Sequence, residues 1–184
     1  SLCREGIQRA ARSLQRAFVD GGNAEAREDM SLAGLFSGMA LANAKLGAVH
    51  GFAGPLGGMT SAPHGAICGR LLACVVQANV LALQNHPPEA NEGTSSVDAK
   101  AMMARFDEIG RLVTGKDTAT ASDAVSWTGD LATALGLPGL RRYGLSSVDF
   151  PAIVAQAKKA SSMQGNPITL TDEELTGILE WAIG

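Results

Sequence analysis

Residues 33–57 read AGLFSGMALANAKLGAVHGFAGPLG, a stretch made mostly of glycine, alanine and other apolar residues. Small residues recur in it at every fourth position, at Gly34, Gly38 and Ala42 and again at Ala40, Ala44 and Ala48. On a helix, each such row lies along one face and lets a neighbouring helix approach closely. An interior glycine costs about 1 kcal/mol relative to alanine, so close packing should compensate for it. We therefore predict a central buried helix over residues 23–47, followed by a glycine-rich turn that reaches residue 65.

Helical periodicity continues through nearly all of the remaining chain. A first helix, with its apolar face at Ile7, Ala10 and Leu14, should end at Gly21, and Asn23 should cap the next one. Further helices are predicted over residues 66–83, 97–114, 122–135 and 149–160, with a polar loop over residues 85–96, and a last helix should follow the capping box of Thr171 and Glu174. The sequence thus predicts an all-α fold: one bundle-like domain, residues 1–184, of seven or eight helices around the central buried helix.

Composition excludes some partner classes. The net charge is −3, no run of Lys or Arg occurs, and there are only two Trp, one Tyr and five Phe. A nucleic-acid footprint is therefore not expected. The apolar stretch over residues 31–62 contains many glycines, Lys45 and Pro55, so it is not predicted to span a membrane.

The three cysteines, Cys3, Cys68 and Cys74, form neither a disulfide framework nor a C-x-x-C pair. We interpret them as reduced thiols of a cytoplasmic protein.

Two of the three histidines, His50 and His64, flank the predicted glycine-rich turn and are 14 residues apart. A hairpin there could bring them together, and imidazole is a frequent transition-metal ligand. From spacing alone, two interpretations stay open: the histidines bind a metal, or they donate hydrogen bonds to nearby carbonyls.

The surrounding motifs resemble those of one family. The matching pieces are, in chain order, residues 33–57, Pro63-His64-Gly65, Leu137-Pro138 with Leu140 and Gly144, and Asn166-Pro167 followed by residues 170–174. They resemble, respectively, A-G-x-A-F-x-N-A-x-L-G with H-x-x-x-H-x-L-G, P-H-G, G-L-P-x-x-L-x-x-x-G and the N-P ending of iron-containing (group III) alcohol dehydrogenases. That family lies in the dehydroquinate synthase-like superfamily. The resemblance covers essentially the whole chain.

The resemblance implies a C-terminal helical domain that packs on an N-terminal nucleotide-binding domain. Such enzymes interconvert a small alcohol with an aldehyde or ketone, using NAD(P) and a divalent metal, iron or zinc. One Asp and three His hold the metal, and His50 and His64 match two of these ligands. The nucleotide-binding domain is not in this sequence, so we expect it to be the missing partner.

This sequence departs from the family pattern in two places. It contains no Asp-x-x-x-His, which supplies the other two ligands, so we expect no tight metal binding and no activity from this chain alone. Gly54 stands where the family has the second histidine of H-x-x-x-H, which is thought to help proton movement. The alternatives are a non-catalytic helical interaction module derived from such a domain and an unrelated helical domain. The apolar face left without its partner domain could also form a homo-oligomer.

Overall fold

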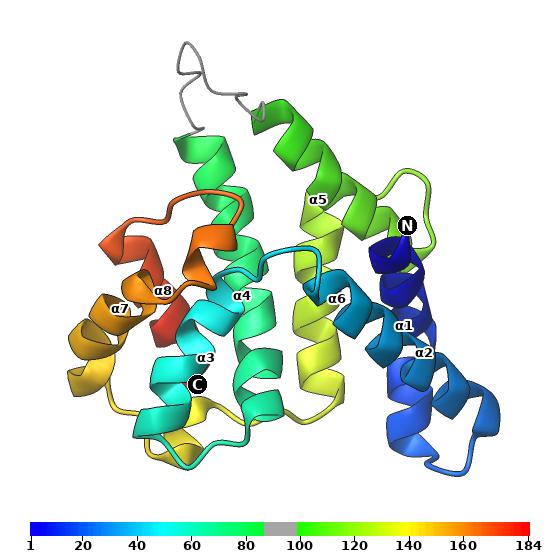
Figure 1. Cartoon of the computed structure of the whole chain (residues 1–184), viewed down its shortest axis with the longest axis horizontal. Helices are drawn as coiled ribbons and strands as arrows, with labels where there is room; N and C mark the ends of the chain where they lie inside the picture. The colour runs from blue at the N-terminus through cyan, green and yellow to red at the C-terminus, as the bar shows by residue number, and fades with distance from the viewer. Residues whose placement is uncertain (87–98) are drawn as a thin grey trace. The chain divides into compact units, whose positions relative to one another are not determined.

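A computed structural model describes residues 1–86 and 99–184, and in these ranges it contains eight α-helices, three short 3₁₀ helices and no strand (Figure 1). The predicted all-α class is confirmed. The α-helices are α1 (Leu2–Val19), α2 (Ala24–Leu41), α3 (Ala48–Met59), α4 (His64–Asn85), α5 (Ala99–Thr114), α6 (Ala121–Ala134), α7 (Phe150–Lys159) and α8 (Asp172–Ile183). The 3₁₀ helices are η1 (Leu140–Tyr143), η2 (Ser147–Asp149) and η3 (Met163–Gly165). The predicted starting residues 97 and 98 of α5, and the predicted loop from residue 87 onward, lie outside the described residues.

Residues 1–44 and 104–135 form one compact unit, and residues 45–103 and 136–184 form another. In the first unit α1 packs along α2 around a buried carboxylate, Asp29. Arg12 donates two hydrogen bonds to it at 2.6 and 2.7 Å, Arg9 donates one at 2.8 Å and Ser13 one at 2.6 Å. These partners hold the pKa of Asp29 well below its usual range, with the hydrogen bonds from Arg12 as the largest cause. A buried charge of this kind is tolerated because it is paired and hydrogen-bonded.

The second unit is organised by α4, which contacts α3 and α8. Nine residues of α4 are buried, among them Ile67 and Leu71, which are fully enclosed. Of the described helices, α4 alone is long and apolar enough to cross a membrane, and its contacts are those of the core helix of a folded domain. The last helix, α8, starts at the predicted capping box, in which Thr171 and Glu174 accept hydrogen bonds from each other's backbone N–H.

The predicted glycine-rich turn over residues 47–65 is wrong, because residues 48–59 form α3. Phe52 and Leu56 are one helical turn apart and fully buried. Burying each is worth about 1.5–3 kcal/mol, which offsets the low helix propensity of the glycines. Pro55 lies within the helix and removes one backbone donor from it. The change of direction falls instead on residues 60–63, where Thr60 accepts from the backbone N–H of Ala62 and donates to the carbonyl of Leu56.

The predicted central helix over residues 23–47 is also corrected. Asn23 caps α2 as expected, but the helix ends at Leu41, where the Asn43 side chain donates to the carbonyl of Met39. Within its own unit, α2 is not closely approached along Gly34 and Gly38: apart from the backbone of α2 itself, no described atom lies within 4 Å of a Cβ built on either glycine. The long, partly buried helix of this fold is α4.

Candidate metal centre

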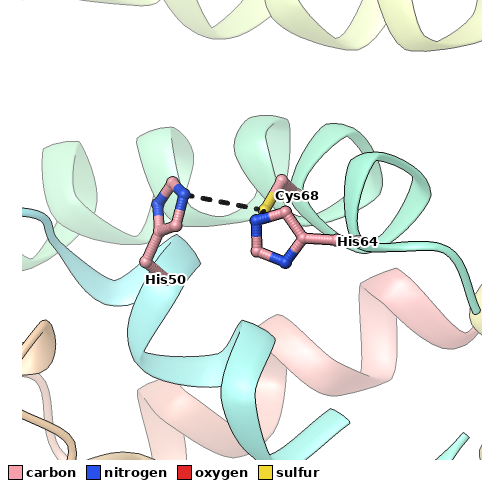
Figure 2. Close-up of side chains that lie close together, drawn as sticks. All are labelled: His50, His64 and Cys68. Carbon is pink, nitrogen blue, oxygen red and sulfur yellow. Dashed lines mark hydrogen bonds between the residues drawn. The ribbon is translucent and has the colours of Figure 1, made fainter. Parts of the chain in front are cut away.

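Three potential metal ligands meet where α3 and α4 begin. His50 lies in the first turn of α3, His64 is the first residue of α4, and Cys68 follows one turn later on α4. The Nε2 atom of His64 lies 3.4 Å from the sulfur of Cys68, and the Nε2 atom of His50 lies 3.9 Å from it (Figure 2). The two imidazole centroids are 5.5 Å apart. Within the described ranges, these residues form the one group of three such side chains whose donor atoms all lie within 4.8 Å of one another.

Burial affects the protonation of two members of this cluster, and only the effect on His50 favours metal binding. Burial lowers the pKa of His50, and the positive charge that His64 can carry lowers it further. His50 is therefore neutral near pH 7, the state in which an imidazole nitrogen can coordinate. Burial raises the pKa of the Cys68 thiol, so without a metal the group stays protonated. Two imidazoles and one thiol, from His50, His64 and Cys68, make a donor set that a divalent transition metal accepts.

The start of α3, and with it His50, is held by a side chain from a distant segment. The Oδ1 atom of Asn166 accepts a hydrogen bond from the backbone N–H of Ala48 at 3.1 Å, which caps the helix across 118 positions of sequence. The same amide exchanges two hydrogen bonds with Asn79 of α4, at 2.6 and 3.3 Å, and donates to the carbonyl of Ile168 at 2.8 Å. Asn166 thus joins the start of α3 to α4.

Close packing fixes the same end of α3 against η3. A Cβ built on Gly51 would lie 2.8 Å from Cε and 3.2 Å from Cβ of Met163. A Cβ built on Gly165 would lie 1.9 Å from the carbonyl oxygen of Leu46, which no side chain can tolerate. Gly165 is therefore required here by its close approach to backbone, whereas at Gly51, which immediately follows His50, a side chain would press on Met163.

The structure brings together the two histidines that the sequence singled out. It does not use the predicted glycine hairpin to do so, because the first turns of two helices present the side chains. The sequence analysis missed Cys68, which was interpreted only as a reduced thiol. The available signal was the i, i+4 spacing of His64 and Cys68, which places both on one face of a helix. His86, the third histidine, lies apart and pairs with Glu174 at 2.7 Å.

Comparison with known proteins identifies the family. The model described as "Fe-containing alcohol dehydrogenase family, C-terminal" matches residues 1–183. The chain belongs to this family. It is 33% identical over 180 residues to the 1,3-propanediol dehydrogenase of Klebsiella pneumoniae, covering 97% of this chain and 43% of that protein. It is 32% identical over 178 residues to alcohol dehydrogenase 4 of Schizosaccharomyces pombe, covering 96% of this chain and 38% of that protein.

Two solved structures share the fold. The structure of a 1,3-propanediol oxidoreductase superposes with a TM-score of 0.80 at 30% identity, covering 97% of this chain and 44% of that one. The alcohol dehydrogenase of Oenococcus oeni gives a TM-score of 0.81 at 30% identity, covering 99% and 44%. This family member thus spans less than half the length of the relatives it matches.

Gly54 lies one turn after His50 on α3 and is exposed. Apart from its own helix backbone, no described atom lies within 4 Å of a Cβ built on it, so close packing does not explain the glycine.

Proposed function

We propose that this chain performs the role of the C-terminal domain in a metal-dependent, NAD(P)-linked oxidoreductase that interconverts an alcohol and a carbonyl compound. The observation that supports the proposal is the convergence of His50 and His64, from two helices, on one point in a chain of this family. In this proposal both imidazoles hold a divalent metal, iron or zinc, and the chain forms one wall of the substrate cleft. When bound, such a metal polarises the alcohol or carbonyl oxygen as a Lewis acid.

The chain's own contribution is positioning. The Asn166 amide fixes the start of α3, and residues 60–63 set the start of α4, so both imidazoles are presented from rigid helix ends. Sites built on helices hold ligands more precisely than sites on loops. Gly54 offers no proton-carrying side chain on the exposed face of α3, so the proton must leave through another group or water.

The remaining parts of the proposal extend from the family. A nucleotide-binding domain supplies the NAD(P) site, an Asp-x-x-x-His motif early in the helical domain supplies the other two ligands, and residues 1–184 act as one domain beside the nucleotide-binding domain. Without that partner the chain is proposed to be inactive. The three free cysteines fit a reducing, cytoplasmic location. The homo-oligomer and the substrate class, a small alcohol or an aldehyde or ketone, stay predictions.

The test uses the whole protein as its gene encodes it, with His50→Ala, His64→Ala and His86→Ala variants. His86 is the matched control, because it is the one other histidine and lies outside the cluster. We expect the first two variants to lose bound iron or zinc and alcohol-dependent NAD(P) reduction, while His86→Ala keeps both. Equal metal content in all three variants would refute the ligand assignment. Metal retention without any turnover in the unmodified protein would favour the non-catalytic interaction module.

A further inference from the structure

We infer that residues 137–144 form a positioning segment for the His64 imidazole, and that this positioning depends on the backbone conformation of Gly144. The segment runs from the turn after α6 to the end of η1. The inference rests on the proposed function only in taking His64 to be a metal ligand. The position of the imidazole itself can be tested in the chain without a metal.

The positioning segment contacts the chain on both sides of His64. Three residues before it, Ser61 donates its backbone N–H to the carbonyl oxygen of Tyr143 at 3.1 Å, and its hydroxyl donates to the same oxygen at 3.4 Å. Five residues after it, Leu137 packs on Gly69 of α4, where a built Cβ would lie 2.9 Å from Cδ1 of that leucine. One short segment thus holds the start of α4 before and after His64.

Gly144 sets the direction of the carbonyl that holds Ser61. Its φ of 94° ends η1 in the left-handed region, and the N–H of Leu145 then donates to the carbonyl of Leu140 at 3.3 Å. The carbonyl oxygen of Tyr143, at the end of η1, cannot be paired by so short a helix and accepts from Ser61 instead. Because this carbonyl lies in the peptide plane next to Gly144, a residue that avoids positive φ would rotate it away.

The other end of the positioning segment is fixed on α8. A Cβ built on Gly139 would lie 2.5 Å from the carbonyl oxygen of Ile183, so only glycine fits there. Arg70 of α4 donates to the carbonyls of Trp181 at 2.8 Å and Ala182 at 3.2 Å. The end of α8 therefore holds both the segment and α4. A change at Gly144 should move the turn before His64 rather than the whole segment.

The two imidazoles are positioned by different segments. Asn166 caps the start of α3, which carries His50, whereas residues 137–144 hold the turn that leads into His64. No residue belongs to both arrangements. The two imidazoles can therefore be displaced separately, which a general loss of stability would not do.

The experiment compares Gly144→Ala and Gly144→Asn with two controls, Gly115→Ala and Ser61→Ala. Gly115 also has a left-handed φ, of 70°, and a Cβ built on either glycine has no described atom within 4 Å beyond its chain neighbours. Gly115 follows α5 in the other compact unit, so its variant carries a similar strain away from His64. Ser61→Ala removes only the hydroxyl and keeps the backbone N–H that Tyr143 accepts.

The first measurement is long-range ¹H–¹⁵N NMR of the histidine rings in the metal-free chain at about pH 9, where imidazoles are neutral. We expect Gly144→Ala to shift the signals of His64 and to leave those of His50 and His86 in place. Gly144→Asn should shift them less, because asparagine adopts the left-handed conformation more readily than alanine. Both controls should leave His64 unchanged. Far-ultraviolet circular dichroism checks that each variant keeps its helices.

The second measurement is zinc affinity of the whole protein as its gene encodes it. We expect Gly144→Ala to weaken zinc binding by about tenfold, the lower end of the range for groups that orient a metal ligand. The two controls should keep the affinity of the unmodified protein. Leu137→Ala removes the contact with Gly69 without straining the backbone. It gives an independent test in case Gly144→Ala loses its helices, and it should shift the His64 signals too.

Unchanged His64 signals in helical Gly144→Ala or Leu137→Ala chains would overturn the inference. A larger shift for the bulkier Gly144→Asn, or equal shifts of His50 and His64, would also overturn it. If zinc stays bound in the whole protein while the His64 signals do not move, the positioning role fails and the proposed function stands. If the unmodified whole protein binds no zinc, the proposed function fails, while a selective shift of His64 would still support the positioning segment.

Discussion

Asn166→Ala should destabilise the unit that carries the metal centre by about 2–4 kcal/mol. Within residues 1–86 and 99–184, the amide of Asn166 is the one hydrogen-bonding partner of the side chain of Asn79, which is only 4% exposed. Leaving that buried amide unpaired costs about 1–3 kcal/mol. Losing the cap on the backbone N–H of Ala48 adds about 1 kcal/mol. Because α3 then loses the contact that fixes its first turn, zinc affinity through His50 should fall too.

The assay is urea unfolding followed by circular dichroism, combined with a zinc titration. Asn43→Ala is the matched control: it also removes an asparagine that donates to a backbone carbonyl, but at an exposed position. We expect the control to change the free energy of unfolding by less than about 0.5 kcal/mol. The double variant Asn79→Ala/Asn166→Ala should lose less free energy of unfolding than the two single variants lose together, because each single substitution already removes the same pair of hydrogen bonds. A loss for Asn166→Ala no larger than that of the control would refute the reasoning.

Three further predictions concern other contacts. Gly54→Ala should raise the free energy of unfolding by about 0.5–1 kcal/mol, because the new Cβ meets no other element. Gly51→Ala on the same helix should stabilise the chain less or destabilise it, because its new Cβ presses on Met163 of η3. Equal gains for the two variants in thermal unfolding would contradict this. The hydrogen bond to Glu174 raises the pKa of His86, so the pair's stabilisation is complete below the usual value of 6.5 and is lost as the pH rises through the raised value. His86→Ala should therefore be less stable than the unmodified chain at about pH 6 and equally stable at about pH 9. A difference in free energy of unfolding that grew as the pH rose would argue against the pair. For Asp29 the pH dependence has the opposite sign: its lowered pKa stabilises the fold at pH values above its usual pKa of 3.8, and this stabilisation is lost as the pH falls further. Asp29→Asn should therefore be less stable than the unmodified chain at neutral pH, and the difference should shrink in acid. Urea unfolding at several pH values measures this, and a difference that did not shrink in acid would contradict it.

Much of the helical fold follows from local signals in the sequence. Asn23 and Thr171 cap helices as predicted, because a capping side chain acts within three residues of its own position. The course of residues 42–59 does not follow in this way. Glycine and proline there indicate a turn, yet burial of Phe52 and Leu56 and the distant Asn166 cap make residues 48–59 helical. Tertiary contacts outweigh local propensity at this point.

The candidate site was predictable in part. The motif around His50 and His64 singles out both residues, and family resemblance gives them a role. Cys68 could not be joined to them by spacing alone, because an isolated thiol on an apolar helix is most often a buried, inert side chain. Only the packing of the first turn of α3 against α4 shows that His50 approaches the same sulfur as His64.

The most direct measurement is an anomalous diffraction map at the zinc absorption edge, from crystals of this chain grown with Zn²⁺. A single strong peak is expected about 2.0–2.1 Å from a ring nitrogen of both His50 and His64. Zinc located elsewhere in the chain, with His50 and His64 uncoordinated, would contradict the metal centre itself.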